Sequence, residues 1–252
     1  MSNNLTEVTR GKKLYEGKAN TIYETNDQFL LEMESTDRIS AGNGKKTDVV
    51  TGKGISNNTI SSALFKLFED AEIPTHYVCE GSNAYSKVIR KANMIKLEVI
   101  GRFIAAGSFC KCYGVEEGHV FDKMIFELTY KDDSLNDPRI SESAAVDGLN
   151  LLSEDDLEDI KFYTYQIGEC AKDFFAQCNL TLVDFKVEFG FDAETGAVIL
   201  CDEFSPDTCR LWDEDGNSLD KDVFRTDCGD VSATYEKVLD LVKSILWGLC
   251  HC

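Results

Sequence analysis

The chain has 252 residues, of which 43% are hydrophobic and 28% are charged, and these proportions are typical of a globular protein rather than a disordered one. Its 45 acidic and 26 basic residues give a formal net charge of -19, so the chain as a whole should repel nucleic acids and anionic membranes. A phosphate-bearing ligand must therefore meet a local basic pocket or a metal ion.

The length suits one large domain or two lobes that share a core. No run of ~18 apolar residues predicts a membrane span, and the first residues, Met1-Ser-Asn-Asn-Leu5, lack the apolar run of a signal peptide. The ten cysteines form no CxxC pair. Cys110-Lys-Cys112 and Cys250-His-Cys252 are CxC pairs, for which we favour reduced thiols over metal ligands, as in a cytoplasmic protein.

The first predicted elements are strands. Residues 12–34 predict a β-hairpin with a turn at Gly17-Lys18-Ala19. Residues 56–71 predict a helix, capped by Ser56 and ended before Pro74, because apolar residues recur there at intervals of three and four.

Further elements follow along the chain. Residues 77–79 and 94–100 predict strands. A long helix is expected to start at Ser153, where the acidic residues 154–156 would lie in the first turn and interact with the helix dipole rather than with a metal. Residues 232–249 predict a second amphipathic helix with one buried stripe.

The stretch 182–204 predicts two paired strands. A five-residue turn at 192–196 would pair Phe191 with Ala197 and place Lys186 opposite Asp202, whereas a slip by one residue would turn Asp202 to the other face. The first strand alternates apolar with charged side chains, which predicts one apolar and one charged face: Val183, Phe185, Val187 and Phe189 against Asp184, Lys186 and Glu188.

Three segments carry ligand-binding chemistry. Tyr15-Glu-Gly-Lys-Ala-Asn-Thr-Ile22 places a glycine and a lysine between strands, where backbone amides and an ammonium can approach a phosphate; an ordinary hairpin tip is the alternative. The polar run Asp37-Arg-Ile-Ser-Ala-Gly-Asn-Gly-Lys-Lys46 is either a ligand-binding loop or an exposed one. In the run 98–108, Arg102 and Ser108 can donate hydrogen bonds to a carboxylate or phosphate of a ligand. The alternative is that Arg102 forms a structural ion pair.

The fourth segment combines the charged face of residues 184–188 with Cys201-Asp-Glu-Phe-Ser-Pro-Asp-Thr-Cys-Arg210. Clustered carboxylates suit Mg²⁺, which takes few protein oxygens and completes its shell with water and nucleotide phosphates. Arg210 and Arg225 would hold a second, anionic substrate. The combination indicates Mg-nucleotide chemistry on an anionic substrate.

The same segments resemble the phosphoribosylaminoimidazole-succinocarboxamide synthase (SAICAR synthetase) family. The matching blocks run in family order over nearly the whole chain, from residue 13 to about 230. They are KLYEGKANTIYET, DRISAGNGKKTDVVTGKGISNNTISS, AEIPTH, MIKLEVIGRFIAAGS, GVEEG, LTYKDDSLNDPRI, LVDFKVEFG, DEFSPDTCRLWD and LDKDVFR.

The resemblance implies an α+β fold of two lobes, residues 1–92 and 93–252, with antiparallel sheets and an ATP cleft between the lobes similar to those of kinases and ATP-grasp enzymes. It implies a ligase that condenses L-aspartate with 5-aminoimidazole-4-carboxylate ribotide in purine biosynthesis, using ATP and Mg²⁺ and giving the succinocarboxamide, ADP and phosphate. The implied partners are these small molecules and, as is common for the family in bacteria, a second copy of the chain, without nucleic acid or membrane.

The resemblance also implies roles for individual residues, motif by motif. Nucleotide binding is implied for Lys18, Ala19, Asn20, Ile22, Met94, Glu188 and Asp202, and metal binding for Asp202 and Asp137. Binding of the ribotide and of anionic groups is implied for Arg102, Ser108, Arg210, Lys221, Asp222 and Arg225. Contact with the reacting groups is implied for Asp184, Lys186 and Arg210.

Three positions depart from the family pattern. Asn20 stands where a second lysine is frequent, Lys96 where proline is usual, and Gly101 where a β-branched residue is usual, so nucleotide affinity and the stiffness of the hinge are open. Two other functions are kept as alternatives. A small-molecule kinase would release ADP without aspartate, and a non-catalytic nucleotide-binding module would bind ATP and release none.

Overall fold

The computed structural model describes residues 8–42 and 44–249, with side chains placed as far as residue 246. Within this range the chain combines antiparallel sheets with α-helices, which confirms the predicted α+β class. The expectations for the first five residues, for Asn43 and for the Cys250-His-Cys252 pair concern residues outside the described range. Among the described residues, no helix is both long enough and apolar enough to cross a membrane.

The first sheet is built from the N-terminal part of the chain and has the order β1-β2-β3-β7-β6. Its strands are β1 (Arg10–Glu16), β2 (Asn20–Thr25), β3 (Leu30–Ser35), β7 (Ser86–Arg90) and β6 (Tyr77–Glu80). The strands predicted at residues 12–34 and 77–79 are therefore confirmed. The polar run at residues 37–46 is predicted to be a loop, but much of it belongs to a hairpin formed by β4 (Arg38–Ala41) and β5 (Lys46–Val49). The two strands pair through backbone hydrogen bonds, which do not require apolar side chains.

The second sheet has the order β10-β9-β11-β12, and two further strands pair with β11. Its strands are β10 (Val120–Tyr130), β9 (Leu97–Ile104), β11 (Thr181–Asp192), β12 (Val198–Cys201), β13 (Cys209–Trp212) and β8 (Ala92–Met94). The single strand predicted at residues 94–100 is two strands, β8 and β9. The chain bends at residues 95–96, where the Leu97 N–H donates to the Ile95 carbonyl (2.8 Å), so the two strands pair with different parts of β11.

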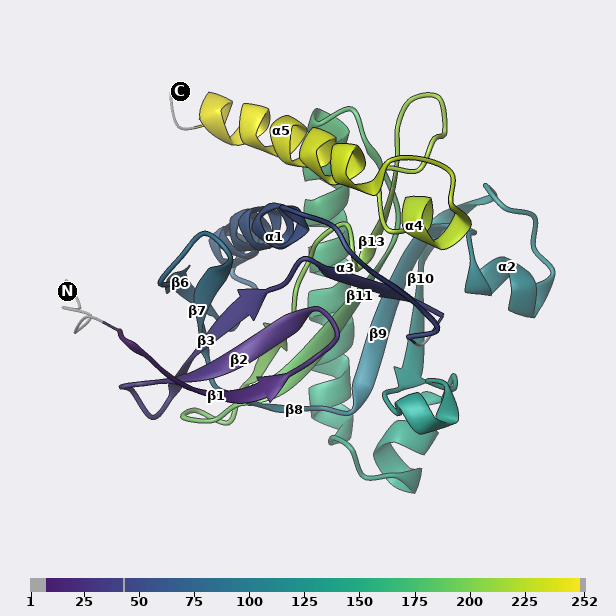
Figure 1. Ribbon diagram of the computed structural model, residues 1–252. Coiled ribbons are helices and arrows are strands. Elements are labelled where there is room, and N and C mark those ends of the chain that lie inside the picture. The colour runs from purple at the N-terminus through teal and green to yellow at the C-terminus, as the bar shows by residue number, and fades with distance from the viewer. Residues whose placement is uncertain (1–7, 43, 250–252) are drawn as a thin grey trace.

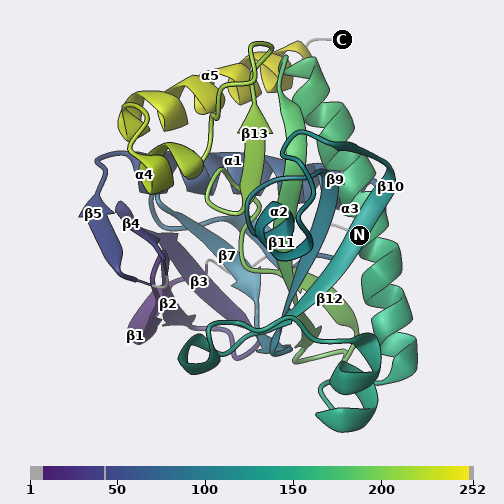
Figure 2. The ribbon, with the colours of Figure 1, turned by 90° about the vertical axis from the view of Figure 1, so that its right-hand side faces the viewer.

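The helices are α1 (Lys53–Asp70), α2 (Ser108–Tyr113), α3 (Glu154–Gln177), α4 (Asp222–Thr226) and α5 (Val231–Leu249), with single turns at Asp133–Leu135 and Ala144–Gly148. Figures 1 and 2 show α1 and α5 packed side by side across one end of the molecule, while α3 runs along the back of the second sheet. Because α1 also packs on β3, β6 and β7, it joins the first sheet to the rest of the chain.

The helix starts illustrate one correct and one wrong prediction. The hydroxyl of Ser153 accepts from the Asp156 N–H and the Asp156 carboxylate accepts from the Ser153 N–H, so the predicted start of α3 is confirmed as a capping box. Ser56 does not cap α1. The helix begins one turn earlier, because Gly52 adopts a φ of 83°, which glycine tolerates, and Ser56 is already buried within the helix.

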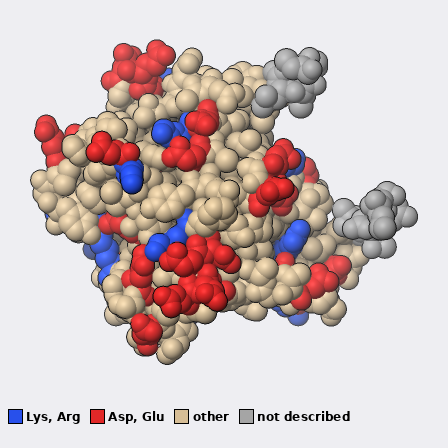
Figure 3. Space-filling view, turned by 180° about the vertical axis from the view of Figure 1, so that it is seen from behind, with Lys and Arg blue, Asp and Glu red and all other residues tan. Residues whose placement is uncertain are grey.

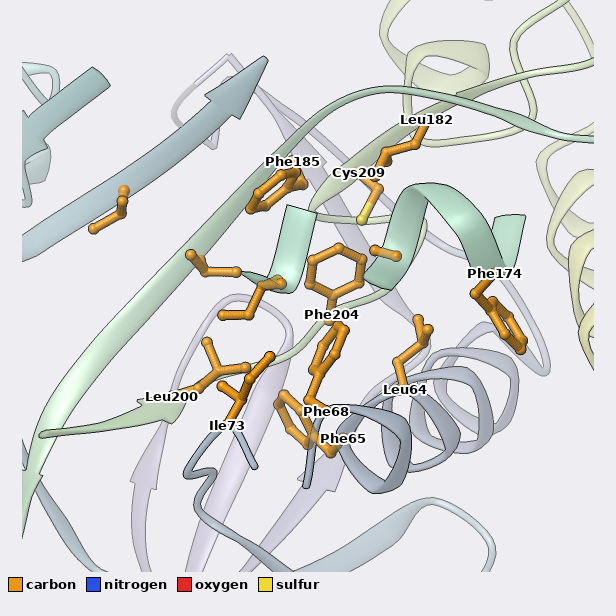
Figure 4. Close-up of a cluster of buried hydrophobic side chains, with 14 of the residues drawn as sticks. Leu64, Phe65, Phe68, Ile73, Phe174, Leu182, Phe185, Leu200, Phe204 and Cys209 are labelled. Carbon is orange, nitrogen blue, oxygen red and sulfur yellow. The ribbon is translucent and has the colours of Figure 1, made fainter. Parts of the chain in front are cut away.

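A cluster of aromatic rings joins the helices to the second sheet (Figure 4). Phe68 from α1 meets Phe204 edge-on with ring centroids 5.3 Å apart, and Phe204 in turn lies 5.5 Å from Phe185 of β11. All three rings are buried. Burial of each contributes roughly 1.5–3 kcal/mol relative to exposure, so this contact holds α1 against the strand that carries the charged face.

We predict that Gly101 is required by the ring of Phe185, its cross-strand partner in the β9–β11 pair. A Cβ at position 101 would lie 2.4 Å from Cζ of Phe185, so Gly101→Ala should lower the free energy of unfolding by about 1–3 kcal/mol through overpacking. Urea unfolding measures the change. Gly148→Ala is the control, because its Cβ would meet nothing nearer than 3.9 Å. Equal stability of the two variants would contradict this account of the packing.

Candidate active site

A cavity of about 760 Å³ is lined by residues of both sheets. It collects every site residue predicted from the sequence except Asp222: Lys18, Ala19, Asn20, Ile22, Met94, Arg102, Ser108, Asp137, Asp184, Lys186, Glu188, Asp202, Arg210, Lys221 and Arg225. Residues more than 200 positions apart in the chain thus meet in one space, and the cavity is the candidate active site.

The turn between β1 and β2 forms one end of this cavity. The Gly17 N–H donates to the Asn20 carbonyl (2.8 Å), and Thr36 donates to the Ala19 carbonyl from both its N–H (2.8 Å) and its hydroxyl (2.9 Å). These bonds hold the turn in place. The Lys18 ammonium lies 2.6 Å from a carboxylate oxygen of Asp133, which the second half of the chain supplies. Lys18 therefore already meets an anionic group at the mouth of the cavity.

Lys186 is the centre of the charged face of β11. Its Nζ lies 3.0 Å from Glu98, 3.0 Å from Glu188 and 4.0 Å from Asp202. Burial opposes the charged form of Lys186, but these three carboxylates outweigh it and raise its pKa. Glu188 also pairs with Lys131. Burial opposes its ionisation as well, yet the two lysines lower the pKa of Glu188, so Lys186 and Glu188 form an ionised pair.

Asp202 reaches this cluster although the predicted register is wrong by one residue. Phe191 pairs with Val198 and not with Ala197. The Asp192 N–H donates to the Ala197 carbonyl (2.9 Å), so the turn between these two residues holds only the four residues 193–196. Pairing ends at Cys201, and Asp202 adopts a φ of 60°. This left-handed conformation takes the carboxylate out of the strand alternation, so it still approaches Lys186.

Arginines and carboxylates alternate along the other end of the cavity. Arg102, only 2% exposed, donates to Glu127 (2.5 Å) and to Asp184 (2.5 Å). Arg210 donates to Asp184 (2.7 Å) and to Asp222 (2.7 Å). The sequence leaves two roles open for Arg102, anion binding and a structural ion pair. Arg102 forms the ion pairs, and it also lines the cavity, where it can contact a ligand.

Asp222 does not line the cavity but bonds two arginines that do. Its carboxylate accepts from Arg210 and from Arg225. Gly107 approaches the same assembly closely, since a Cβ there would lie 2.4 Å from Nη2 of Arg210. Asp222 and the backbone at Gly107 thus restrict how the guanidinium of Arg210 can point.

The carboxylates also fit a magnesium ion. The described residues contain no group of three or more His, Cys, Asp or Glu side chains arranged as metal ligands, but Mg²⁺ needs only one or two carboxylates when a nucleotide supplies the remaining oxygens. Burial and the charge of Glu188 raise the pKa of Asp202 to about 7. Burial and Glu98 likewise raise the pKa of Asp137. A cation between such groups would relieve both costs.

Several lining residues were not predicted from the sequence as site residues. Glu98 and Lys131 bond the cluster around Lys186, and His76, Glu203 and Asp207 form part of the wall. Glu98 could have been found, because it lies four residues before Arg102 in a strand and therefore on the same face. Lys131 and His76 come from distant segments and carry no such local signal.

Charge in the cavity is balanced, in contrast to the chain as a whole. The eight acidic lining residues are Glu98, Asp133, Asp137, Asp184, Glu188, Asp202, Glu203 and Asp207, and the eight basic ones are Lys18, Arg38, Arg102, Lys131, Lys186, Arg210, Lys221 and Arg225. Outside it, carboxylates gather in a broad patch on the face seen in Figure 3. The cavity is thus the place where an anionic ligand meets the least repulsion.

Known proteins share this fold and these segments. The SAICAR synthetase family model matches residues 13–242. The phosphoribosylaminoimidazole-succinocarboxamide synthase of Streptococcus agalactiae serotype V is 45% identical over 227 residues, which cover 90% of this chain and 96% of that protein. The crystal structure of the Ehrlichia chaffeensis synthase of the same name superposes with a TM-score of 0.88 at 37% identity, covering 92% of this chain and 98% of that one. A SAICAR synthetase in complex with ADP superposes with a TM-score of 0.87 at 38% identity, covering 94% and 98%.

We predict that Asp202 is a destabilising carboxylate. Its pKa of about 7 lies above that of an unfolded aspartate, so the unfolded chain releases the proton first and stability falls as the pH rises from about 4 to 7. Asp202→Asn removes this cost. Because the carboxylate is 25% exposed, we expect a gain of about 2 kcal/mol in the free energy of unfolding at pH 8 and almost none at pH 4, measured with urea in the absence of divalent metal.

Asp184→Asn is the matched control within the same cavity. It leaves Arg102 and Arg210 without their shared carboxylate and should lower stability by about 3 kcal/mol at pH 8. If Asp202→Asn destabilised the chain in the same way, Asp202 would be a structural ion-pair partner and the assignment would be wrong.

Proposed function

The chain belongs to the SAICAR synthetase family, an enzyme family of purine biosynthesis, and on this premise we propose that it is an ATP-dependent ligase joining L-aspartate to 5-aminoimidazole-4-carboxylate ribotide. The observation that supports this most is the cavity itself. It combines a glycine-lysine turn, carboxylates around Lys186 and paired arginines, and these suit a polyphosphate, a divalent cation and a second anionic substrate.

We assign the nucleotide to the side formed by the β1–β2 turn. Backbone groups of the turn and the ammonium of Lys18 would bind the phosphates, with the phosphates replacing Asp133 as the partner of Lys18. The apolar side chains of Ile22 and Met94 would flank the adenine, since both line the cavity there. Glu188 would accept from the ribose hydroxyls once one of its two lysines shifts.

Asp202, with Asp137, would hold Mg²⁺ against the phosphates. When bound, this ion would neutralise the charge that develops on the transferred phosphoryl group. Lys186 and Lys131 support the same site from the protein side, because they keep the neighbouring Glu188 ionised. The raised pKa values of Asp202 and Asp137 support this assignment, since a bound cation lowers both.

The ribotide and aspartate would occupy the arginine-rich side. Arg102, Ser108 and Arg210 offer guanidinium and hydroxyl donors, and the Arg102 Nη2 already lies 3.3 Å from the Ser108 hydroxyl. Lys221 and Arg225 add two more cations. Asp222 would act indirectly, by holding Arg210 and Arg225 in place.

The chemistry that we propose proceeds in two steps, because a carboxylate is a poor electrophile. An oxygen of the imidazole carboxylate attacks the γ-phosphorus of ATP, and the bond to ADP breaks, leaving an acyl phosphate. The aspartate amine then attacks the carbonyl carbon, and the carbon–oxygen bond breaks as phosphate leaves. Positioning and charge neutralisation supply most of the rate. Asp184 is the candidate acceptor of the amine proton, once an arginine releases one of its oxygens.

The first test is Mg²⁺-dependent ADP release with ATP, the carboxylated ribotide and L-aspartate, omitting each in turn. We expect release to require all three and to match the succinocarboxamide formed. Release that persists without aspartate and yields a phosphorylated metabolite would instead identify a kinase. ATP binding without any release would identify a non-catalytic module.

The second test follows the oxygen. With ¹⁸O in the substrate carboxylate, the acyl-phosphate path delivers one labelled oxygen into the released phosphate, detected by mass spectrometry. Phosphate without label would exclude this path while leaving the ligase assignment in place. The homodimer and the cytoplasmic location remain predictions, which sedimentation and cell fractionation can test.

A further inference from the structure

Lys87 is a buried lysine that has no hydrogen-bond partner in the part of the chain that the structure describes. It lies in β7, its side chain is fully buried, and its Nζ has no hydrogen-bond acceptor among the described residues. Burial lowers the pKa of Lys87 to about 8, against the attraction of Glu203, Glu80 and Asp202. The side chain therefore stays mostly charged at neutral pH, in a place where an unpaired charge is expensive.

The sheet places this ammonium behind the wall of the cavity. Lys87 pairs with Met33 across the β3–β7 ladder, and Met33 pairs with Ile22, so the three side chains share one face. Ile89, two residues on, lies on that face as well. Met33, Ile22 and Ile89 all line the cavity, while Lys87 itself lies deeper, with its Nζ 5.1 Å from the centre of the Phe65 ring.

Further buried polar atoms among the described residues also lack a hydrogen-bond partner. Nε2 of His76 has no hydrogen-bond partner among the described residues, and its ring packs edge-on against Phe65 with ring centroids 5.2 Å apart. Oδ1 of Asn20 is a further buried acceptor without a partner, and Asn20 lies on the same face of the sheet as Lys87. Buried side-chain oxygens of Asn57, Asn58 and Ser62 in α1 also lack a partner among the described residues.

Glu203 connects Lys87 to the metal-binding side. Its carboxylate is buried and accepts only from neutral groups among the described residues, the Asn20 amide (3.4 Å) and the Ser205 hydroxyl (2.7 Å). It is also the carboxylate whose charge acts most strongly on Lys87. Glu203 and Lys87 are thus separated counter-charges, and Asp202 is the chain neighbour of Glu203.

We propose that Lys87 is a positioning residue for MgATP, whose ammonium acts through Glu203 and Asp202 to offset their charge at the back of the nucleotide site. This inference rests on the proposed function. Glu203 is buried, Asp202 is partly exposed and both line the cavity, so their charges would repel the polyphosphate unless a nearby cation offset them. Asn20, which lines the cavity beside Glu203, is neutral and supplies none. Lys87 supplies that cation from the neighbouring side of the same sheet.

Lys87→Met tests this role, with Lys66→Met as the matched control. Lys66 also carries a single positive charge, but it is 55% exposed and pairs with Glu80 at the surface. We expect Lys87→Met to raise the Kd for MgATP, measured by calorimetry, about tenfold, and to raise KM for ATP while that for aspartate stays within twofold. Lys66→Met should leave all three unchanged. Thermal unfolding of Lys87→Met is measured alongside, so that affinity is compared at a temperature at which both variants are folded.

Asn20→Lys provides the rescue. In the Lys87→Met background it restores an ammonium on the same face of the sheet, so it should recover most of the lost MgATP affinity. The gain in affinity from Asn20→Lys should be larger in the Lys87→Met background than in the wild-type chain. An unchanged Kd in Lys87→Met would overturn the inference, and so would a loss shared equally by ATP and aspartate. Because affinity is measured without turnover, a chain that binds MgATP but forms no product would refute the ligase and still decide this inference.

Discussion

Strand β11 is buried on both faces, and the rest of the structure depends on this constraint. Its apolar face packs on α3 and on the aromatic cluster around Phe185, which fixes the strand rigidly. Its other face carries Asp184, Lys186 and Glu188. A buried charge without a partner is costly, so these side chains form ion pairs. The strand pairs with β8, β9, β12 and β13, so it receives partners for these charges from several parts of the chain. A rigid row of buried, paired charges is suited to bind charged substrates.

This arrangement explains how an acidic protein can offer a site to an anionic ligand. The chain carries a net charge of -19, yet the cavity lining is balanced, because as many lysines and arginines as carboxylates line it. Pairs such as Arg210 with Asp184 hold the cations in place before a ligand arrives. The excess acidic charge lies on outer surfaces such as that in Figure 3, where it favours solubility and repels polyanions too large for the cavity.

Single residues with unusual backbone or packing set the details of the site. Asp202 leaves its strand through a left-handed conformation, and Gly107 lets the backbone approach Arg210. Gly101 makes room for the ring of Phe185 directly beside Arg102. Lys87, behind the wall of the cavity, has no hydrogen-bond partner among the described residues. Each of these features lowers the free energy of unfolding locally, and each lies at or beside the cavity. Such features are expected where a structure serves binding rather than stability.

The sequence by itself determined the α+β class, the hydrophobic periodicity of α3 and α5, the alternation of β11 and, through its motifs, the family and about half of the residues that line the cavity. These signals are local or carried by contiguous blocks. It did not determine the β11–β12 register, which depends on whether the turn holds four or five residues, nor the start of α1 at Gly52. Only the tertiary structure placed Lys131 and Lys87 around the site, because burial and ion pairing between distant segments leave no periodic trace in the chain.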